Sequence, residues 1–227
     1  MNEASNIGRR RIAAKEESTE VYNKRRKEII QAAVRVFNRS GFAGASLSAV
    51  AAELNIHRAS LYYYISSKED LFDGILREVL EGNAALANRL RTSKASPRRK
   101  LHELIVAFMT SYGKNYPLLY IYVRENLSHV NPKRSAWSKV ARKLNREVEN
   151  ALIAIIEEGY ADRTFRRAGP ARIVAYGVLG IIGWTSRWFR PDTSTLSAEE
   201  IGRIYADMIL CGLESPARDQ CRPPAGA

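Results

Sequence analysis

The strongest constraint on the fold comes from residues 26–72, in which three amphipathic segments follow one another without a gap. In the first segment, apolar residues recur at the spacing of one helical face, and Ser40-Gly41 follows them. Glycine readily adopts the left-handed conformation that ends a helix. We therefore expect a helix over residues 21–39 whose apolar stripe is Ile29, Ile30, Ala33, Val36 and Phe37.

A tight turn separates the second and third segments. The second begins after Ser46, whose hydroxyl can cap a helix. Asn55 follows its last apolar residue, and asparagine tolerates the positive φ that the turn of a helix-turn-helix requires. A third helix is then predicted over residues 58–65, with Leu61 and Ile65 facing inward. Its other side is small and polar, as suits a recognition helix that approaches base edges and phosphates.

A fourth helix is predicted to begin at Ser67-Lys68-Glu69-Asp70, a Ser/x/x/Asp capping pattern. Lys68 falls in the first turn, where its ammonium group and the helix N-terminus together can hold a phosphate. The preceding run of Tyr62, Tyr63 and Tyr64 has a plainer explanation as core packing, and we expect one of the three to belong to the core.

These elements together resemble the DNA-binding domain of the tetracycline-repressor (TetR) family of bacterial transcription regulators. The likeness extends over about residues 24–84 and includes the run LYYYISSKEDLF. It implies that Tyr63 and Lys68 contact phosphates. It also implies the following set of DNA-contacting positions: Ser46, Ser48, Arg58, Ala59, Ser60, Tyr62, Tyr63 and Lys68.

Three departures from the family's pattern leave the predicted fold intact. Asn55 stands where the family usually has Gly, His57 where it usually has Ser or Thr, and Tyr64-Ile65 where His-Phe is common. His57 is a weaker helix N-cap than Ser, and it leaves the base preference open.

The net charge is strongly positive and lies mostly outside this region. Residues 1–72, with 12 Lys/Arg and 8 Asp/Glu, contribute +4 of the total +12, so the rest of the chain carries +8. Such a surplus fits either solvated faces or a body that receives an anionic ligand. It gathers within residues 89–100, 133–146 and 163–172. Arg9-Arg10-Arg11 in the N-terminal arm fits either a DNA-grasping extension or a solvated tail.

Composition argues against several classes of protein. The longest charge-free apolar stretch, residues 173–186, has 14 residues and is too short to cross a bilayer as a helix. No apolar block follows the basic N-terminus, and Cys211 and Cys221 form no metal-binding or pairing pattern. We expect a cytoplasmic protein without membrane partner, metal or cofactor, in which Cys211 is a small core residue. No catalytic motif is present, so an enzyme is not expected.

The residues after the helix-turn-helix lack period-two alternation, so an all-α chain of about nine helices is expected. The later helices are predicted over residues 68–91, 97–115, 118–129, 132–158, 170–190 and 198–213. We divide the chain into a flexible basic arm (1–20), a helix-turn-helix domain (21–84), a ligand-binding and dimerisation domain (85–213) and a disordered tail (214–227).

The segment 170–190 is apolar on nearly all sides, which is more than one face against its own subunit requires. Three glycines spaced three apart leave a groove for a second helix, and their spacing is wrong for a dinucleotide site. The resemblance implies a homodimer in which the last two helices of each subunit form a four-helix interface. The interface residues that we expect are Gly177, Gly180, Ile181, Trp184, Ile204 and Met208.

Residues 183–201 resemble one branch of the family, namely repressors of fatty-acid or sterol-ring degradation that release DNA on binding an acyl-coenzyme A thioester. Many of those relatives have Asn where this chain has Gly183. Arginines here can bind phosphates and tryptophans can stack on adenine, although the tryptophans equally suit an interface core. The candidate ligand contacts are Tyr112, Tyr120, Trp184, Arg187, Trp188 and Arg190.

The sequence therefore predicts a ligand-responsive regulator, a repressor that binds a palindromic double-stranded DNA operator as a homodimer. Its effector is a small molecule, for which an acyl-coenzyme A thioester is the first candidate. One alternative is a regulator of the same fold that responds to another hydrophobic molecule or a drug. A different class, a nonspecific architectural DNA-binding protein, would use the positive charge alone.

Overall fold

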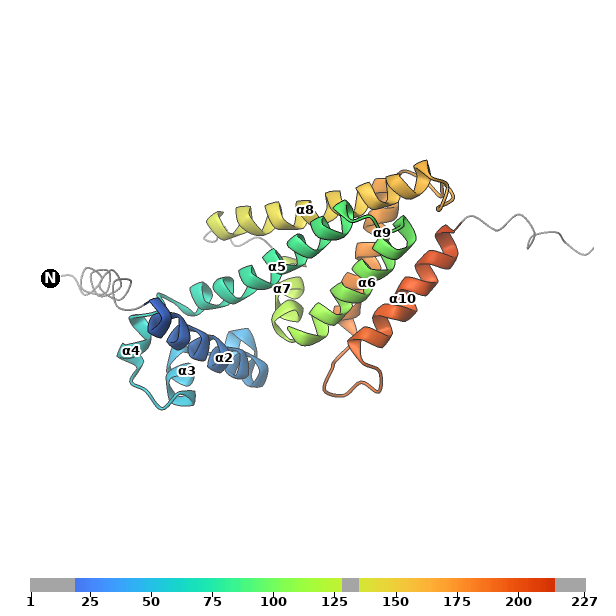
Figure 1. Cartoon of the computed structure of the whole chain (residues 1–227). Helices are drawn as coiled ribbons and strands as arrows, with labels where there is room; N and C mark the ends of the chain where they lie inside the picture. The colour runs from blue at the N-terminus through green and yellow to red at the C-terminus, as the bar shows by residue number, and fades with distance from the viewer. Residues whose placement is uncertain (1–18, 128–134, 215–227) are drawn as a thin grey trace, which may run out of the picture. The chain divides into compact units, whose positions relative to one another are not determined.

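The structure, a computed structural model, describes residues 19–127 and 135–214. Within these ranges the prediction of an all-α fold with a helix-turn-helix is confirmed (Figure 1). Residues 1–18, 128–134 and 215–227 lie outside the description, and with them most of the predicted arm and tail. The helices are α2 (Thr19–Gly44), α3 (Leu47–Glu53), α4 (Arg58–Tyr62), α5 (Lys68–Thr92), α6 (Pro97–Lys114), α7 (Leu118–Leu127), α8 (Ser135–Ala161), α9 (Ala171–Trp184), the short 3-10 helix η2 (Thr185–Arg187) and α10 (Ala198–Leu213).

The described residues form two compact units. Residues 19–78 and 116–127 make the head unit, and residues 79–115 and 135–214 make the body unit. Helix α5 contributes to both units, and α7 packs with α2 in the head unit. The sequence prediction divided the chain at residue 84 and counted this segment with the body, and that division stays a prediction.

The core of the head unit is formed by the inner faces of its helices. Phe37 of α2 meets Phe72 of α5 edge to face, with 5.8 Å between ring centroids. Gly41 breaks the helical geometry of α2 with φ 65° and ψ 172°. The interruption lies where we expected it, although this ψ is not that of a left-handed helix, and helical residues resume up to Gly44.

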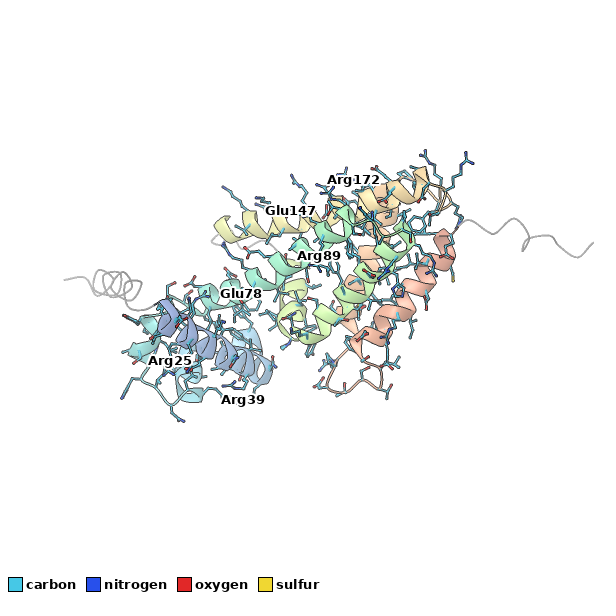
Figure 2. All side chains as sticks on the ribbon, viewed as in Figure 1. Arg25, Arg39, Glu78, Arg89, Glu147 and Arg172 are labelled. Atoms are coloured by element: carbon cyan, nitrogen blue, oxygen red, sulfur yellow. The ribbon has the colours of Figure 1, made fainter. Side chains whose placement is uncertain are left out.

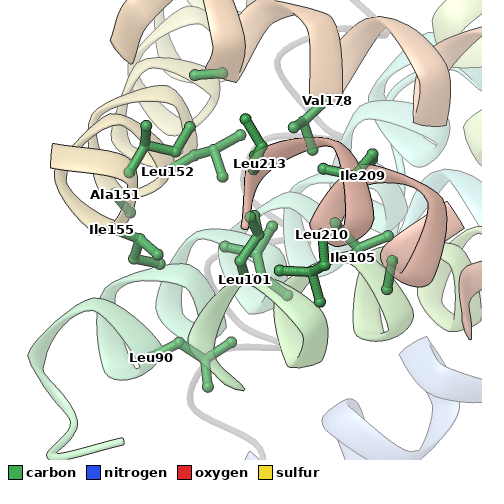
Figure 3. Close-up of a cluster of buried hydrophobic side chains, with 14 of the residues drawn as sticks. Leu90, Leu101, Ile105, Ala151, Leu152, Ile155, Val178, Ile209, Leu210 and Leu213 are labelled. Atoms are coloured by element: carbon green, nitrogen blue, oxygen red, sulfur yellow. The ribbon is translucent and has the colours of Figure 1, made fainter. Parts of the chain in front are cut away.

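The core of the body unit lies between α6, α8, α9, α10 and the second half of α5 (Figure 3). Glycines bring α6 and α10 close together. A Cβ atom on Gly113 would lie 2.5 Å from Cβ of Ala198, and one on Gly202 would lie 3.0 Å from Cβ of Met109. Helix α10 begins with a capping box, because Ser197 accepts from the backbone of Glu200 while the Glu200 carboxylate accepts from that of Ser197.

Two residues of the body unit lie where local sequence did not place them. Lys100 is in the first basic group, yet only 3% of its surface is exposed. Its Nζ donates to both carboxylate oxygens of Glu158, at 2.9 and 2.7 Å, and to the carbonyl of Arg91 at 3.2 Å. Cys211, expected in the core, is exposed on α10, so that prediction was wrong.

In the described part of the chain, no helix is long and apolar enough to span a membrane.

Candidate nucleic-acid interface and subunit surface

Helix α3 begins at a side-chain cap. The Oγ atom of Ser46 accepts from the backbone N–H of Ala49 at 3.1 Å, as its position in the sequence predicted. Ser46 and Ser48 are both exposed at this end of the helix. The Ser46 hydroxyl therefore fixes the first turn of α3 and remains accessible to a phosphate.

The turn between α3 and α4 is held by its backbone. Asn55 has a φ of 51°, as predicted from its tolerance of the left-handed region. The N–H of Ile56 donates to the carbonyl of Ala51 at 3.0 Å and closes the turn. His57 then stands at the N-cap of α4 and makes no side-chain cap hydrogen bond, as expected of a residue less suited than Ser.

Helix α4 ends at Tyr62, three residues earlier than predicted. The N–H groups of Tyr64 and Ile65 both donate to the carbonyl of Leu61, so the chain leaves the helix in a turn. Leu61 and Ile65 are buried as expected, while Arg58, Ala59 and Ser60 are exposed. The exposed face of α4 is consequently small, polar and basic.

The Arg58 guanidinium is held along the surface of α4 by a neighbouring hydroxyl. Its Nε and Nη2 donate to Oη of Tyr62 at 3.0 and 2.5 Å. The guanidinium carbon lies 5.4 Å from the centroid of the Tyr62 ring. Tyr62 thus orients the one arginine on this face, which limits the rotamer entropy lost when Arg58 binds a base.

The other two tyrosines of the run have different surroundings. Tyr64 stacks on Tyr22 of α2, with 5.3 Å between ring centroids, and is the member of the run that packs toward another helix. Tyr63 lies beside Tyr64 at 5.0 Å and is partly exposed. Tyr63 therefore packs beside an aromatic ring while part of its side chain stays accessible to solvent.

Lys68 has a structural contact that the sequence did not indicate. Its Nζ donates to the carbonyl of Phe42 at 2.9 Å and lies 4.6 Å from the centroid of the Phe42 ring. An ammonium group has three donors, so two remain for a phosphate. The capping of α5 was predicted correctly, since the N–H of Asp70 donates to Oγ of Ser67 at 3.0 Å.

A pair of arginines braces α3 against α2, and sequence reasoning missed it. Arg35 donates to Oε1 of Glu53 at 2.8 Å, and Arg39, labelled in Figure 2, donates to Oε2 at 3.3 Å. The hydrogen bond from Arg35 holds the pKa of the Glu53 carboxyl below its usual value, and Arg39 adds to the effect. The brace joins residues 18 and 14 positions apart, beyond the range of helix-spacing patterns.

Helices α9 and α10 expose large apolar side chains. Trp184 is 61% exposed and Met208 is 54% exposed. Ile173 and Tyr176 are exposed too, and the sequence analysis did not name them as interface residues. The four-residue spacing from Ile173 to Gly177 places Ile173 on the same face as the glycines and could have indicated it. Ile181, also expected at the interface, is partly buried and packs against the core of the body unit. The exposed large apolar residues of the two helices are Ile173, Tyr176, Trp184, Ile204 and Met208.

The expected ligand residues are only partly brought together. The guanidinium carbon of Arg187 lies 4.8 Å from the centroid of the exposed Trp184 ring, and Arg190 is exposed nearby in sequence. Trp188 packs on Phe189, which lies 6.2 Å from the buried Tyr112. Tyr120 belongs to the head unit and stacks on Tyr116 at 5.9 Å. Trp184 and Trp188 therefore face solvent in the single chain.

Sequence models of two protein families match the chain. One, described as "Tetracyclin repressor-like, C-terminal domain", matches residues 94–213, and the other, "Bacterial regulatory proteins, tetR family", matches residues 29–75. The chain belongs to the TetR family. The second match contains α3, the turn and α4, so the resemblance inferred from this stretch is confirmed and the chain is a DNA-binding regulator of that family.

Individual members of the TetR family support the same assignment. The HTH-type transcriptional repressor KstR2 of Mycobacterium tuberculosis is 28% identical over 193 residues, covering 84% of this chain and 94% of KstR2. Its solved structure, described as a ketosteroid transcriptional regulator, matches with a TM-score of 0.70 at 22% identity over 84% of this chain and 95% of that one. These relatives are regulators of transcription, and this TetR-family chain is not an enzyme.

Two further solved structures share the fold and contain ligands. AibR in complex with isovaleryl coenzyme A and operator DNA matches with a TM-score of 0.67 at 20% identity, over 85% of this chain and all (100%) of that one. FadR from Bacillus subtilis in complex with stearoyl-CoA matches with a TM-score of 0.65 at 18% identity, over 82% of this chain and 98% of that one. At these identities the likeness establishes the fold.

Proposed function

We propose that this TetR-family chain is a repressor that binds a palindromic operator as a homodimer and leaves it when an acyl-coenzyme A thioester binds the body unit. The observation that carries the proposal is the exposed face of α4, with Arg58, Ala59 and Ser60 behind a fixed turn. Small side chains let the helix approach base edges, and an exposed guanidinium can donate two hydrogen bonds to guanine.

The contacts of the head unit divide into two kinds. Arg58, oriented by Tyr62, is suited to a base edge in the major groove. Tyr63 and Lys68 are suited to phosphates, since both are partly exposed beside the N-terminal end of α5. Phosphate contacts of this kind fix the position of the head, and Arg58 supplies specificity.

Dimer formation is supported by the apolar faces of α9 and α10. Fully burying one large apolar side chain contributes about 1.5–3 kcal/mol, and five such residues are exposed on these two helices. Among the described residues, no atom lies within 4 Å of a Cβ added to Gly177 or Gly180, so a second helix has room to approach there. A dimer also supplies the two heads that half-sites about one DNA turn apart require.

The effector proposal rests on chemistry at the end of α9. An acyl-coenzyme A thioester carries phosphates, which Arg187 and Arg190 can bind, and an adenine, which Trp188 can stack against. AibR and FadR, which have this fold, were solved with isovaleryl coenzyme A and stearoyl-CoA. Release follows if the effector binds more tightly to a conformation whose heads no longer match the operator; nearly complete release needs a difference of about 5 kcal/mol.

Footprinting tests the regulator. The purified chain is expected to protect one short palindrome in DNA from around its own coding region, with two half-sites about one helical turn apart. Continuous protection without a palindrome would contradict a sequence-specific repressor and would indicate an architectural DNA-binding protein.

Titration of the operator complex tests the effector. Free fatty acids, their coenzyme A thioesters and cationic dyes are added in turn, and only the thioesters should release DNA. Combined Arg187→Ala and Arg190→Ala substitution should weaken release at least tenfold, whereas Arg91→Ala with Lys94→Ala, a matched loss of two exposed cations, should not. Release by dyes or free acids alone would refute the thioester, and release unaffected by the first variant would refute the site.

A further inference from the structure

The three basic groups of the body unit differ in what the fold does with them. In the first, Arg98 pairs with Glu214, Arg99 with Glu103 and Lys100 with Glu158, and the other three cations are spread over the end of α5 and the turn after it. In the third, Arg166 donates to a carbonyl of α10, while Arg167 and Arg172 lie over tyrosine rings. The second group, on α8, has no such engagement. Its described members, which we call the α8 stripe, are Lys139, Arg142, Lys143 and Arg146.

The α8 stripe is a continuous basic face. Its members stand at positions i, i+3, i+4 and i+7, so they share one side of the helix, and all four are exposed. Among the described residues, none of the four has a hydrogen bond, an ion pair or a ring contact. Glu147, labelled in Figure 2, and Glu149 lie on the flanks and pair with none of them in the described part of the chain.

The opposite side of α8 anchors the helix. Ala141, Ala151 and Leu152 are buried, and Val148 packs against the core of the body unit. The cations are therefore held in a row on a fixed helix, and no described acidic side chain forms an ion pair with them. Four like charges at this spacing repel one another and cost stability unless an anion meets them.

We propose that the α8 stripe binds the sugar-phosphate backbone of duplex DNA through charge, without contacting bases. Seven residues of helix span about 10 Å, and about 10 Å of duplex axis carries about six phosphates, of which roughly half can face one helix. A row of four cations thus matches about three phosphates. DNA is favoured over an acidic polypeptide because the head unit already holds duplex and raises its effective concentration near the body.

This inference depends on one part of the proposed function, namely that the head unit binds DNA. It adds a sequence-independent component to binding, which would speed the search for the operator and steepen the salt dependence. Each phosphate contact contributes about 0.9 to the slope of log affinity against log salt. Loss of the stripe should consequently reduce that slope by about 2–3.

The experiment uses the full chain and a random-sequence duplex that lacks the operator, with affinity measured by fluorescence anisotropy at several salt concentrations. The stripe variant carries Lys139→Gln, Arg142→Gln, Lys143→Gln and Arg146→Gln. The control variant carries Arg89→Gln, Arg91→Gln, Lys94→Gln and Lys114→Gln, four exposed cations spread over α5, the turn after it and the end of α6. Both variants lose the same net charge.

The stripe variant should bind at least about 100-fold more weakly at 0.1 M salt with the shallower slope, while the control variant keeps the wild-type slope. A variant with Arg142→Lys and Arg146→Lys should also keep it, because phosphates accept either cation as a point charge. If the fourfold variant does not fold, Lys139→Gln with Lys143→Gln should give about half the change in slope.

Three results would overturn the proposal. One is an unchanged slope in the folded stripe variant, and another is an equal loss in stripe and control variants, which would reflect net charge alone. The third is a loss confined to binding of poly-glutamate, which would assign the stripe to an acidic polypeptide. The operator footprint separates the two proposals: it should survive in the stripe variant, and its absence in the wild type would refute the repressor while leaving the slope test intact.

Discussion

Helices α4 and α9 expose side chains of opposite kinds. Helix α4 in the head unit presents Arg58, Ala59 and Ser60, whereas α9 in the body unit presents Ile173 and Trp184. Water solvates the small and polar side chains of α4 well, so this surface needs no protein partner to cover it. The second set gains about 25 cal/mol for each Å² removed from water, so the face of α9 is stabilised when protein covers it. The first surface suits a partner that binds and leaves, and the second suits a lasting one.

The glycines of the body unit show the same division. Gly113 and Gly202 stand where α6 and α10 approach closely, and an added Cβ would lie within 3.0 Å of a neighbour. Gly177, Gly180 and Gly183 have nothing within 4 Å of such a Cβ. The first pair therefore serves packing within the subunit, whereas the three glycines of α9 serve no packing against the part of the chain that the structure describes.

The largest effect that would test this comparison is Gly180→Arg. Because the site is open, the arginine should leave the fold of the subunit intact while placing a bulky charge on the apolar face. We expect a monomer of 25.5 kDa in sedimentation and, since one head must then bind alone, at least a 100-fold loss of operator affinity.

Gly82→Arg is the matched control for charge and size. Gly82 is an exposed residue of α5 with nothing within 4 Å of its added Cβ, and it lies outside the apolar face. This variant should remain dimeric. A wild-type chain that sediments as a monomer at micromolar concentration, or a dimeric Gly180→Arg variant, would show that α9 does not form the interface.

Signals confined to a few residues predicted the caps and the turn. Ser46 and Ser67 each cap a backbone N–H three positions later, and Asn55 adopts the positive φ of the turn, as their sequence context indicated. The predicted length of α4 was wrong because the N–H of Tyr64 donates to the carbonyl of Leu61, three positions back, in place of the carbonyl of Ser60 that an α-helix would use. Where no capping residue ends a helix, its last residue depends on which carbonyl each backbone N–H chooses, and the spacing of apolar residues does not predict that choice.

Residues whose surroundings come from distant segments escaped prediction. Lys100 is buried because Glu158, 58 positions later, provides its carboxylate. Cys211 lies in an apolar stretch of α10, but this helix has a buried side and a solvent side, and Cys211 lies on the solvent side. The sequence did not indicate that Trp184 and Trp188 are exposed, and the set of ligand-binding residues remains a prediction. The set of DNA-contacting residues also remains a prediction, although these residues are exposed or partly exposed, as DNA contact requires.

A second prediction contrasts the two kinds of glycine. Gly113→Ala should destabilise the subunit by about 1–3 kcal/mol, because the new Cβ would lie 2.5 Å from that of Ala198 and force α6 and α10 apart. Gly177→Ala adds the same methyl group in open space and should leave the stability of the monomer unchanged or raise it by up to about 1 kcal/mol. Urea unfolding in the Gly180→Arg background measures both, and equal losses would contradict the division.

A third prediction sharpens the description of α4. Arg58→Ala should cost about 1–3 kcal/mol against the operator and relax the preference at one position of each half-site. Tyr63→Ala should weaken binding to all duplexes alike and reduce the salt slope by about 1. Binding to a library of operator variants distinguishes them. If Arg58→Ala lowered affinity for every sequence equally, its assignment to a base edge would be wrong.

The smallest expected effect concerns the brace between α2 and α3. The hydrogen bond from Arg35 lowers the pKa of Glu53 in the folded chain below the ordinary value of 4.5. A group with a depressed folded pKa stabilises the fold above its unfolded pKa and loses that contribution as pH falls through the folded value. Glu53→Gln should therefore be slightly less stable than the wild type at pH 7, and the difference should shrink as pH falls below 4.5, through the lowered pKa of the folded Glu53. Urea midpoints across pH 3–7 measure it, with Glu69→Gln, an exposed residue of the same unit, as the control. A difference between wild type and Glu53→Gln that stayed constant down to pH 3 would show that shape, and not the ionised brace, holds α3 on α2.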